Sequence, residues 1–468
     1  MMRENEKITS YIDWPLLITY FLIMSLGLMT VYSVGYDEET NMSFSFSTLF
    51  GRQLIWVGVS LFLGLLVFLI DSEIYRKFSI PIYAGTLFLL VVVLFTPPIN
   101  GARAWLGIGP FGIQPAEFAK IGTAILLASY IDKINIRLQT IPNILYCLAI
   151  IAIPMVLIML QPDAGTFVVF TSFFFILYRE GITFDPIVLS IINSFPGMKF
   201  KQTWIGTHFI PILFVVVFIS VVTLFMSKTT FDFEILGLYE VPSIAVIIAV
   251  YFLFAILFYL IGRNFISSRN RKQFLIVISL TFIIFSTLSA SVSTAFNSLK
   301  QHQKNRIELL LGLNEDDQRD GEDYNRNRAM TAVGSGGFLG KGYTKATLSS
   351  IKSNHVPESD TDFIFCPFAE EWGFVGALII VGLYIFFLLR IITIAERQRS
   401  TYNRVYAYSV GMILFYHFAI NIGMNIGLVP IIGIPLPFFS YGGSSMMSFS
   451  VMFFILLKLD SQRRDTLF

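Results

Sequence analysis

The sequence has little charge for its length. Only 14% of its 468 residues are Asp, Glu, Lys or Arg, whereas soluble domains carry about 25%. Hydrophobic residues make up 55% and aromatic residues 16% of the chain, and the mean hydropathy is +0.71. These values exclude an ordinary soluble globular protein and indicate a membrane protein.

Cysteine is also scarce. The two cysteines, Cys147 and Cys366, lie beside or within apolar runs, and they offer neither a disulfide framework nor a metal-ligand spacing. We expect no cleavable signal peptide. The first apolar run begins at Pro15, is too long for a signal core and has no small-residue cleavage site behind it.

Several common catalytic motifs are missing. The sequence has no GxxxxGK phosphate loop, no GxSxG elbow and no HExxH helix, and its short loops leave no room for a nucleotide domain. We expect no nucleic-acid partner. The energy for any reaction must therefore come from an activated substrate or from an ion gradient.

Long apolar runs dominate what is present. A spanning helix needs about 20 mostly apolar residues, and only helices or closed barrels satisfy their backbone groups inside a bilayer. The runs do not alternate in polarity, so we predict an all-α polytopic membrane protein with about twelve transmembrane helices. They are expected near 15–35, 54–70, 80–97, 115–131, 141–160, 164–179, 208–226, 241–262, 274–296, 366–390, 405–432 and 437–459.

Lysine and arginine are distributed unevenly between the loops. With the N-terminus in the cytoplasm, twenty of them fall in inner segments, and only Arg52, Arg103 and Lys228 fall in short outer loops. Cytoplasmic loops carry the excess of positive charge in membrane proteins. We therefore predict cytoplasmic N- and C-termini, an even number of helices and an extracytoplasmic loop at 297–365.

That loop is the one long polar segment of the sequence. Loops of this length are usually functional or disordered. The glycine-rich stretches 334–337 and 340–342 flank Phe338 and Leu339, which favours tight backbone turns around an apolar anchor. A flexible tether is the alternative.

A first candidate cluster is GARAWLGIGPFGIQPAEFAK, at 101–120. Trp105 near several glycines is typical of an element at the membrane surface, or of a plain aromatic anchor. Lys120 falls inside an apolar helix, where a charge is costly unless it is paired or in a wet cavity, and Glu117 is one turn away. We expect either a structural ion pair or a site for an anionic group such as a pyrophosphate.

Asp163 belongs to a second cluster, QPDAGT, at 161–166. It follows the turn residue Pro162 and either caps the next helix or meets a substrate or a divalent cation at the outer surface.

The third cluster is PESDTDFIF, at 357–365. Asp362 stands there at the water–lipid boundary, where partial desolvation raises the pKa of a carboxylate toward values useful to a general base. The alternative is that it caps the following helix, with Glu370 and Glu371 buried against basic partners.

The fourth cluster lies near the C-terminus. His417, Asn421 and Asn425 are spaced four apart and form one polar stripe, which favours hydrogen bonds between helices over catalysis. The following PLPFFSYGGSS, at 435–445, contains Ser444 and breaks the helical pattern at an outer turn. Such backbone is tolerated at membrane depth only where it is buried or lines a cavity.

In their order and spacing, these clusters resemble the SEDS family of membrane proteins. The resemblance rests on GARAWLGIGPFGIQPAEFAK, QPDAGT, GSGGFLGKG, PESDTDFIF with AEEWGF, and NIGMNIGLVPIIGIPLPFFSYGGSS. The start IDWPL and the segment LKQHQKNRI, at 299–307, resemble the RodA branch rather than the FtsW branch. Each motif is weak alone, five in order are specific, and together they cover the chain apart from about 183–272.

The resemblance implies a SEDS-type helical bundle with a ten-helix core and a peptidoglycan glycosyltransferase activity. It implies polymerisation of lipid II, which is linked to undecaprenyl pyrophosphate, for cell elongation and rod shape at the outer face of the bacterial cell (inner) membrane. A class B penicillin-binding protein transpeptidase and other elongation-complex membrane proteins are the implied partners. The alternatives are a lipid-linked precursor flippase or transporter, a non-enzymatic scaffold, and a division-type, FtsW-like polymerase.

The resemblance also assigns residues. Asp362 matches the catalytic aspartate and would act as general base in an inverting transfer. The substrate-binding candidates are Trp105, Arg103, Lys120, Glu117, Asp163, Asp360, Glu371 and Ser444.

Two departures from the family pattern occur at the site. Ala104 stands where the family often has Arg, with Arg103 as a substitute, and Asp360 stands where it often has His. A second carboxylate so near could raise the pKa of Asp362 or help to hold a cation. No cofactor is certain, but a divalent cation such as Mg²⁺ could neutralise the leaving pyrophosphate.

The expected organisation has five parts. They are transmembrane helices 1–6 of the core at 1–182, an inserted pair of helices at 183–272, a core helix at 273–296, the large outer loop at 297–365 and the C-terminal core helices at 366–468.

Overall fold

The chain divides into two compact units in the computed structural model. One is formed by residues 1–182 and 319–468, and the other by residues 183–318. The structure describes residues 12–36, 48–98, 103–107, 112–134, 139–194, 199–226, 230–233, 238–264, 271–298, 304, 322–353, 355–429 and 431–463.

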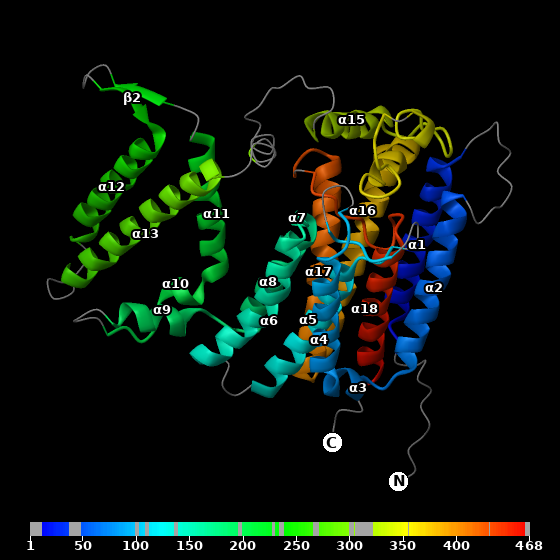
Figure 1. The fold of residues 1–468 in the computed structure, drawn as a ribbon, viewed down its shortest axis with the longest axis horizontal. Helices are drawn as coiled ribbons and strands as arrows, with labels where there is room; N and C mark the ends of the chain where they lie inside the picture. Colours follow the sequence, from blue (N-terminus) through cyan, green and yellow to red (C-terminus); the bar gives the residue numbers. More distant parts are fainter. Residues whose placement is uncertain are drawn as a thin grey trace, which may run out of the picture. The chain divides into compact units, whose positions relative to one another are not determined.

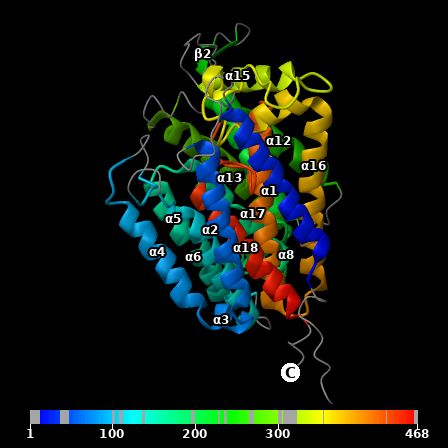
Figure 2. The same cartoon turned by 90° about the vertical axis from the view of Figure 1, so that its right-hand side faces the viewer.

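The first unit is a bundle of long helices (Figures 1 and 2). Its elements are α1 (Trp14–Val34), α2 (Leu49–Leu69), α3 (Ser72–Lys77), α4 (Ser79–Val93), α5 (Pro115–Ile134), α6 (Ile141–Leu160), α7 (Ala164–Phe170), α8 (Ser172–Arg179), α15 (Glu322–Ser335), the 3-10 turn η4 (Ile351–Ser353), α16 (Phe365–Arg397), α17 (Thr401–Asn425) and α18 (Gly443–Ser461). Helix α15 lies across the end of the bundle opposite to the C-terminus (Figures 1 and 2).

The second unit contains three long helices and a small hairpin. Its elements are α9 (Asp185–Ile192), α10 (Trp204–Thr207), α11 (Phe209–Met226), β1 (Thr230–Phe233), β2 (Leu238–Pro242), α12 (Ser243–Gly262) and α13 (Arg271–Ser298). The strands are antiparallel, with Thr230 opposite Pro242. The prediction of an all-α protein did not include this hairpin. Helix α13 packs against α11 and α12, so the contacts of this helix lie in the second unit.

Helices occupy all twelve apolar runs that the sequence indicates. Within the described residues, eight helices are long and apolar enough to cross a membrane: α1, α2, α6, α12, α13, α16, α17 and α18. Three apolar segments are shorter: α4, the α7–α8 segment Ala164–Arg179 and Phe209–Leu224 of α11. The twelfth, α5, carries Glu117, Lys120, Asp132 and Lys133. The chain is a multi-pass, mostly helical membrane protein.

The predicted bounds are wrong mainly near the C-terminus. Helix α17 ends at Asn425 and α18 begins only at Gly443, whereas the hydropathy placed helix up to 432 and again from 437. The apolar residues between them form a loop because the three prolines of this stretch, Pro430, Pro435 and Pro437, lack a backbone donor. In addition, Gly427 and Gly433 take positive φ values of 78° and 66°. Helix α16 extends to Arg397 and contains a non-helical residue, Gly373, with φ 64°.

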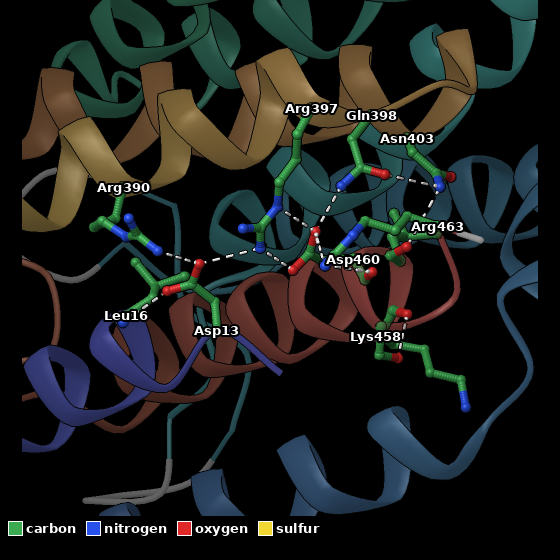
Figure 3. Close-up of polar contacts among 11 residues, drawn as sticks. Asp13, Leu16, Arg390, Arg397, Gln398, Asn403, Lys458, Asp460 and Arg463 are labelled. Atoms are coloured by element: carbon green, nitrogen blue, oxygen red, sulfur yellow. Dashed lines mark hydrogen bonds and ion pairs between the residues drawn. The ribbon is translucent and has the colours of Figure 1, made fainter. Parts of the chain in front are cut away.

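Charged side chains fasten the helix ends on the side of the termini (Figure 3). Asp13 caps α1 by accepting from the Leu16 backbone at 3.1 Å and pairs with Arg390 at 2.6 Å and Arg397 at 3.1 Å. Arg397 also binds Asp460 of α18, with its Nε at 2.9 Å. One pair of buried carboxylates therefore joins α1, α16 and α18.

A single carboxylate fastens the loop at the opposite end. Glu370 of α16 has no exposed side-chain surface and pairs with Lys341 at 2.6 Å. It also accepts from the backbone nitrogens of Thr347, Leu348 and Ser349 at 2.8, 3.0 and 2.9 Å. This part of the outer loop is therefore folded onto α16, which agrees with tight turns rather than with a tether.

We expect Glu370→Ala to lower the free energy of unfolding by about 3–5 kcal/mol, because it removes the carboxylate that pairs with Lys341 and leaves several backbone donors without a partner. Denaturant titration of the purified protein in detergent would measure the change. The matched control is Glu73→Ala, which removes an exposed carboxylate paired with Lys77 at 2.6 Å and should leave stability unchanged. Equal effects of the two substitutions would contradict the assigned role.

Candidate functional site

Asp362 lies in the loop that leads into α16, at the end of the bundle opposite to the C-terminus. The backbone nitrogens of Thr361 and Phe363 both donate to the carbonyl of Glu358, at 3.2 and 3.1 Å. The N-cap of α16 is Ile364, without a side-chain cap. The capping interpretation of Asp362 is therefore wrong, and its carboxyl group is hydrogen-bonded to the Glu358 side chain instead.

Two asparagines of α17 fix the backbone of this loop. The Asn421 amide donates to the carbonyl of Asp362 at 2.8 Å and to that of Ile434 at 2.7 Å. Asn425 donates to the Asp362 carbonyl at 3.4 Å and to the carbonyl of Asn421 at 2.7 Å. The polar stripe thus bonds loops to a helix, as the preference for structural hydrogen bonds predicts.

The loop between α17 and α18 covers the Asp362 carboxylate. A Cβ added at Gly433 would lie 3.2 Å from the Asp362 Oδ2 atom, and the Tyr441 nitrogen donates to the Asp360 carbonyl at 2.9 Å. A side chain at this position would crowd the carboxylate, and the positive φ of Gly433 also favours glycine.

Burial raises the pKa of Asp362 to about 7, and the negative charges of Glu358, Asp360 and Asp163 add to the effect. Burial also raises the pKa of Asp360, with a further contribution from Glu358. The sequence named Asp360 as the neighbour that perturbs Asp362, whereas Glu358 contributes more. A carboxyl group with a pKa near 7 can accept a proton at neutral pH and release it again.

Asp163 belongs to the same end of the bundle and is held by hydrogen bonds. Its Oδ1 accepts a hydrogen bond from the Thr166 backbone at 2.9 Å and so caps α7. Helix capping was one of the two interpretations that the sequence offered. The Asp163 Oδ2 accepts from the Gln114 amide at 2.9 Å, and the Gln114 nitrogen donates to the Ser444 hydroxyl at 3.0 Å. Asp163 and Ser444 are therefore linked through Gln114, a residue to which the sequence motif alone assigns no role.

Trp105 and Arg103 lie in the described segment 103–107. Leu106 forms an isolated antiparallel bridge with Ile113, with N–O distances of 2.8 and 2.6 Å. The Trp105 side chain is 39% exposed, which suits an aromatic group at a membrane surface. Arg103 is exposed and donates to the Leu94 carbonyl at 3.0 Å. Position 104, where the family often has Arg, holds a buried alanine. Arg103 is therefore the positively charged residue of this segment.

Lys120 lies inside the bundle and is already paired. Its ammonium is 2.8 Å from Glu117 and 2.8 Å from the His417 Nε2 atom, with no exposed side-chain surface. His417 bonds the Pro435 carbonyl through Nδ1 at 3.1 Å, so Nδ1 carries the proton and Nε2 accepts from Lys120. Ser448 donates to the second oxygen of Glu117 at 3.1 Å. This is the structural ion pair, and the sequence did not predict that His417 completes it.

Glu371 of α16 is buried and contacts α1. It accepts a hydrogen bond from Ser33, not from a basic group as the alternative interpretation expected. Its neighbour Glu370 does have a basic partner, Lys341. Neither structure nor spacing brings Glu371 to Asp362, whereas Asp163, Glu358 and Asp360 act on that carboxylate directly.

A metal site does not emerge from these carboxylates. Across the described ranges, no three His, Cys, Asp or Glu residues are arranged to hold a metal ion. The divalent cation stays a prediction from the sequence, and no step proposed below passes through one.

Comparison with known proteins gives a consistent result. Peptidoglycan glycosyltransferase RodA of Treponema pallidum (strain Nichols) is 30% identical, covering 96% of this chain and 98% of the relative. Peptidoglycan glycosyltransferase MrdB of Escherichia coli (strain K12) is 26% identical, covering 97% and 95%. A chain from a peptidoglycan synthase complex that coordinates polymerization and crosslinking shares the fold, with a TM-score of 0.65 at 22% identity, covering 97% and 98%.

The family model described as cell cycle protein FtsW/RodA/SpoVE matches residues 13–229 and 247–465. The stretch between the matches, 230–246, holds the β1–β2 hairpin and the start of α12. It is much shorter than the 183–272 region that the motifs left outside the resemblance, so that estimate is corrected. The chain belongs to the FtsW/RodA/SpoVE family, the SEDS family that its motifs resemble.

Proposed function

We propose that this protein is a peptidoglycan glycosyltransferase that polymerises lipid II with Asp362 as general base. Membership of the family and full-length similarity to two relatives named peptidoglycan glycosyltransferases support the activity. The observation that carries the mechanism is a partly buried carboxyl group, at the end opposite to the termini, whose pKa is raised to about 7.

In the reaction, Asp362 accepts the proton of the acceptor sugar's 4-hydroxyl group as its oxygen attacks the anomeric carbon of the donor. The bond from that carbon to the pyrophosphate breaks, and the configuration inverts. The departing pyrophosphate takes the electron pair and needs positive charge nearby. Arg103 is exposed at this end and can meet it directly, whereas Lys120 is enclosed and paired, so Lys120 acts by holding Glu117 and His417 in place.

The protein acts in the bacterial inner membrane with its site on the outer face. The excess of lysine and arginine on the loops at the side of the termini supports a cytoplasmic location for that side. The pyrophosphate-linked substrate has a lipid tail, which the multi-pass bundle meets within the bilayer.

The proposed partner is a class B penicillin-binding protein, which would supply the transpeptidase that this chain lacks. The fold similarity to a chain of a peptidoglycan synthase complex supports this assignment. The relative at 30% identity is a RodA protein, which supports a role in elongation with other elongation-complex membrane proteins. Localisation of a tagged copy along the sidewall, rather than at the septum, would agree.

Asp362→Asn should lower polymerisation of lipid II by about 100-fold or more, because a general base contributes at least that factor. Purified protein, with and without the cognate transpeptidase, would be incubated with labelled lipid II and the glycan ladders counted. Full activity of this variant would refute the base assignment. Translocation of lipid II without ladders from the unmodified protein would instead indicate a flippase.

Activity should rise with pH through an apparent pKa near 7. The pKa of Asp362 is raised, so the carboxyl group holds its proton below pH 7 and becomes a competent base only above it. Glu358→Gln removes a negative neighbour and should move the rising limb of kcat/KM to lower pH. Glu73→Gln, which removes an exposed carboxylate of α3, is the control and should leave the limb in place. An unchanged limb in Glu358→Gln would contradict the proposed coupling.

Asn421 should act as a positioning residue for Asp362. Asn421→Leu removes both of its loop hydrogen bonds, and we expect kcat to fall at least tenfold with KM nearly unchanged, while the rising pH limb shifts. Asn403→Leu is the matched control on the same helix, because Asn403 is buried and bonded at the inner end, to Gln398 and Leu459, both at 3.4 Å. A loss of folded protein without a change in kcat or pH limb would show a merely structural role.

A further inference from the structure

Two apolar side chains project from the outer loop although the loop itself is folded tightly. Phe338 is 67% exposed and Leu339 is 77% exposed. Both belong to the turn 336–342, which follows α15 and is bonded to the start of α16. A rigid, exposed apolar pair is unfavourable in water and marks a surface that meets something apolar.

The position of this turn along the membrane normal can be inferred from α16, to which the turn is bonded. Glu371 and Arg390 are consecutive charged residues of this helix, and the eighteen residues between them, 372–389, carry no charge. They span about 27 Å at a helical rise of 1.5 Å per residue, close to the roughly 30 Å of a hydrocarbon core. No other part of α16 fits that core, so Phe374 lies within it, near the outer edge.

Phe338 lies at the same depth as Phe374. The two rings stack with centroids 6.0 Å apart and planes 24° apart. The Phe374 side chain is 59% exposed, and Leu378, one turn further into the membrane, is 61% exposed. The apolar surface of the turn is therefore continuous with the outward-facing surface of a membrane-spanning helix.

Several backbone groups of the turn are bonded within the protein, which lowers the cost of placing them in hydrocarbon. Within the turn, the Gly340 nitrogen donates to the Gly336 carbonyl at 2.9 Å. The nitrogens of Lys341 and Gly342 donate to the carbonyls of Glu370 and Glu371 in α16, both at 3.0 Å. In the other direction, the nitrogens of Phe374 and Val375 in α16 donate to the carbonyls of Gly337 and Phe338, at 2.9 and 3.2 Å. The last two bonds supply acceptors to α16 where Gly373 interrupts it. The turn and α16 thus exchange backbone hydrogen bonds in both directions.

The close fit of the turn depends on glycine. A Cβ at Gly340 would lie 2.0 Å from the Glu371 carbonyl oxygen, and one at Gly336 would lie 2.2 Å from that of Ala369. The turn is therefore locked against the helix, and it has no room to withdraw Phe338 and Leu339 into the protein.

We propose that the turn 336–342 is embedded in the outer leaflet of the bilayer, with Phe338 and Leu339 among the lipid acyl chains. The turn thereby anchors the outer loop to the membrane. A water-facing docking site for an extracytoplasmic protein domain is the competing occupant. A docking site in water does not explain the depth of the turn, which its contacts with α16 set.

Nitroxide accessibility of the full-length protein in phospholipid vesicles tests the proposal. A spin label at Leu339→Cys should collide with oxygen more often than with a water-soluble nickel chelate, as should a label at Leu378→Cys. A label at Lys77→Cys, whose side chain is 70% exposed in an ion pair with Glu73, should show the reverse. The native thiols Cys147 and Cys366 are buried, and the unsubstituted protein measures their background.

Nickel accessibility at residue 339 equal to that at residue 77 would overturn the proposal and favour a water-facing docking surface. Each labelled protein must melt at the temperature of the unsubstituted protein. Should Leu339→Cys not fold, a label at Phe338→Cys provides the same comparison, with the same two outcomes.

Discussion

One buried amide joins the two loops on which the site depends. Asn421 donates to the carbonyls of Asp362 and Ile434 at 2.8 and 2.7 Å and has no exposed surface. One carbonyl precedes α16 and the other lies between α17 and α18. In an interior with few polar groups, a carbonyl without a donor costs roughly 1–3 kcal/mol. The amide therefore fixes the separation of the loops, and with it the burial that raises the pKa of the Asp362 carboxyl group.

The charges of the bundle are sorted by depth. Asp13, Arg390, Arg397 and Asp460 form one group at the end near the termini, and the carboxylates around Asp362 gather at the other. Lys120 is the exception on α5, and it is neutralised by Glu117 and by the tautomer of His417. Because His417 also bonds Pro435, this buried network supports the same loop that covers Asp362, and Lys120 affects the site through that loop.

The sequence predicted those features that depend on composition along the chain. Continuous apolar runs placed all twelve helices, and the interval of three residues between Glu117 and Lys120 predicted their pair. The sequence did not predict that His417 bonds Lys120 of this pair. Nor did it predict that Glu358 raises the pKa of Asp362 more than Asp360 does. Both contacts depend on how distant helices and the loop backbone pack together. The ends of α17 and α18 were missed since their intervening loop is apolar, and hydropathy does not separate a buried loop from a helix.

A polymerase of lipid-linked sugars must hold its base at a set height above the bilayer, because the substrate's tail is confined to lipid and its sugars to water. Here that height is set by α16. Asp362 precedes the uncharged segment 372–389 by ten residues. Ten residues span about 15 Å at a helical rise of 1.5 Å per residue, which places Asp362 at or just above the headgroup level. Glu370 ties the outer loop to that helix, and the turn carrying Phe338 stacks on Phe374 below. The proposed base and the proposed membrane anchor are thus fixed to opposite ends of one short, kinked helical segment, so that a shift of either would move the other.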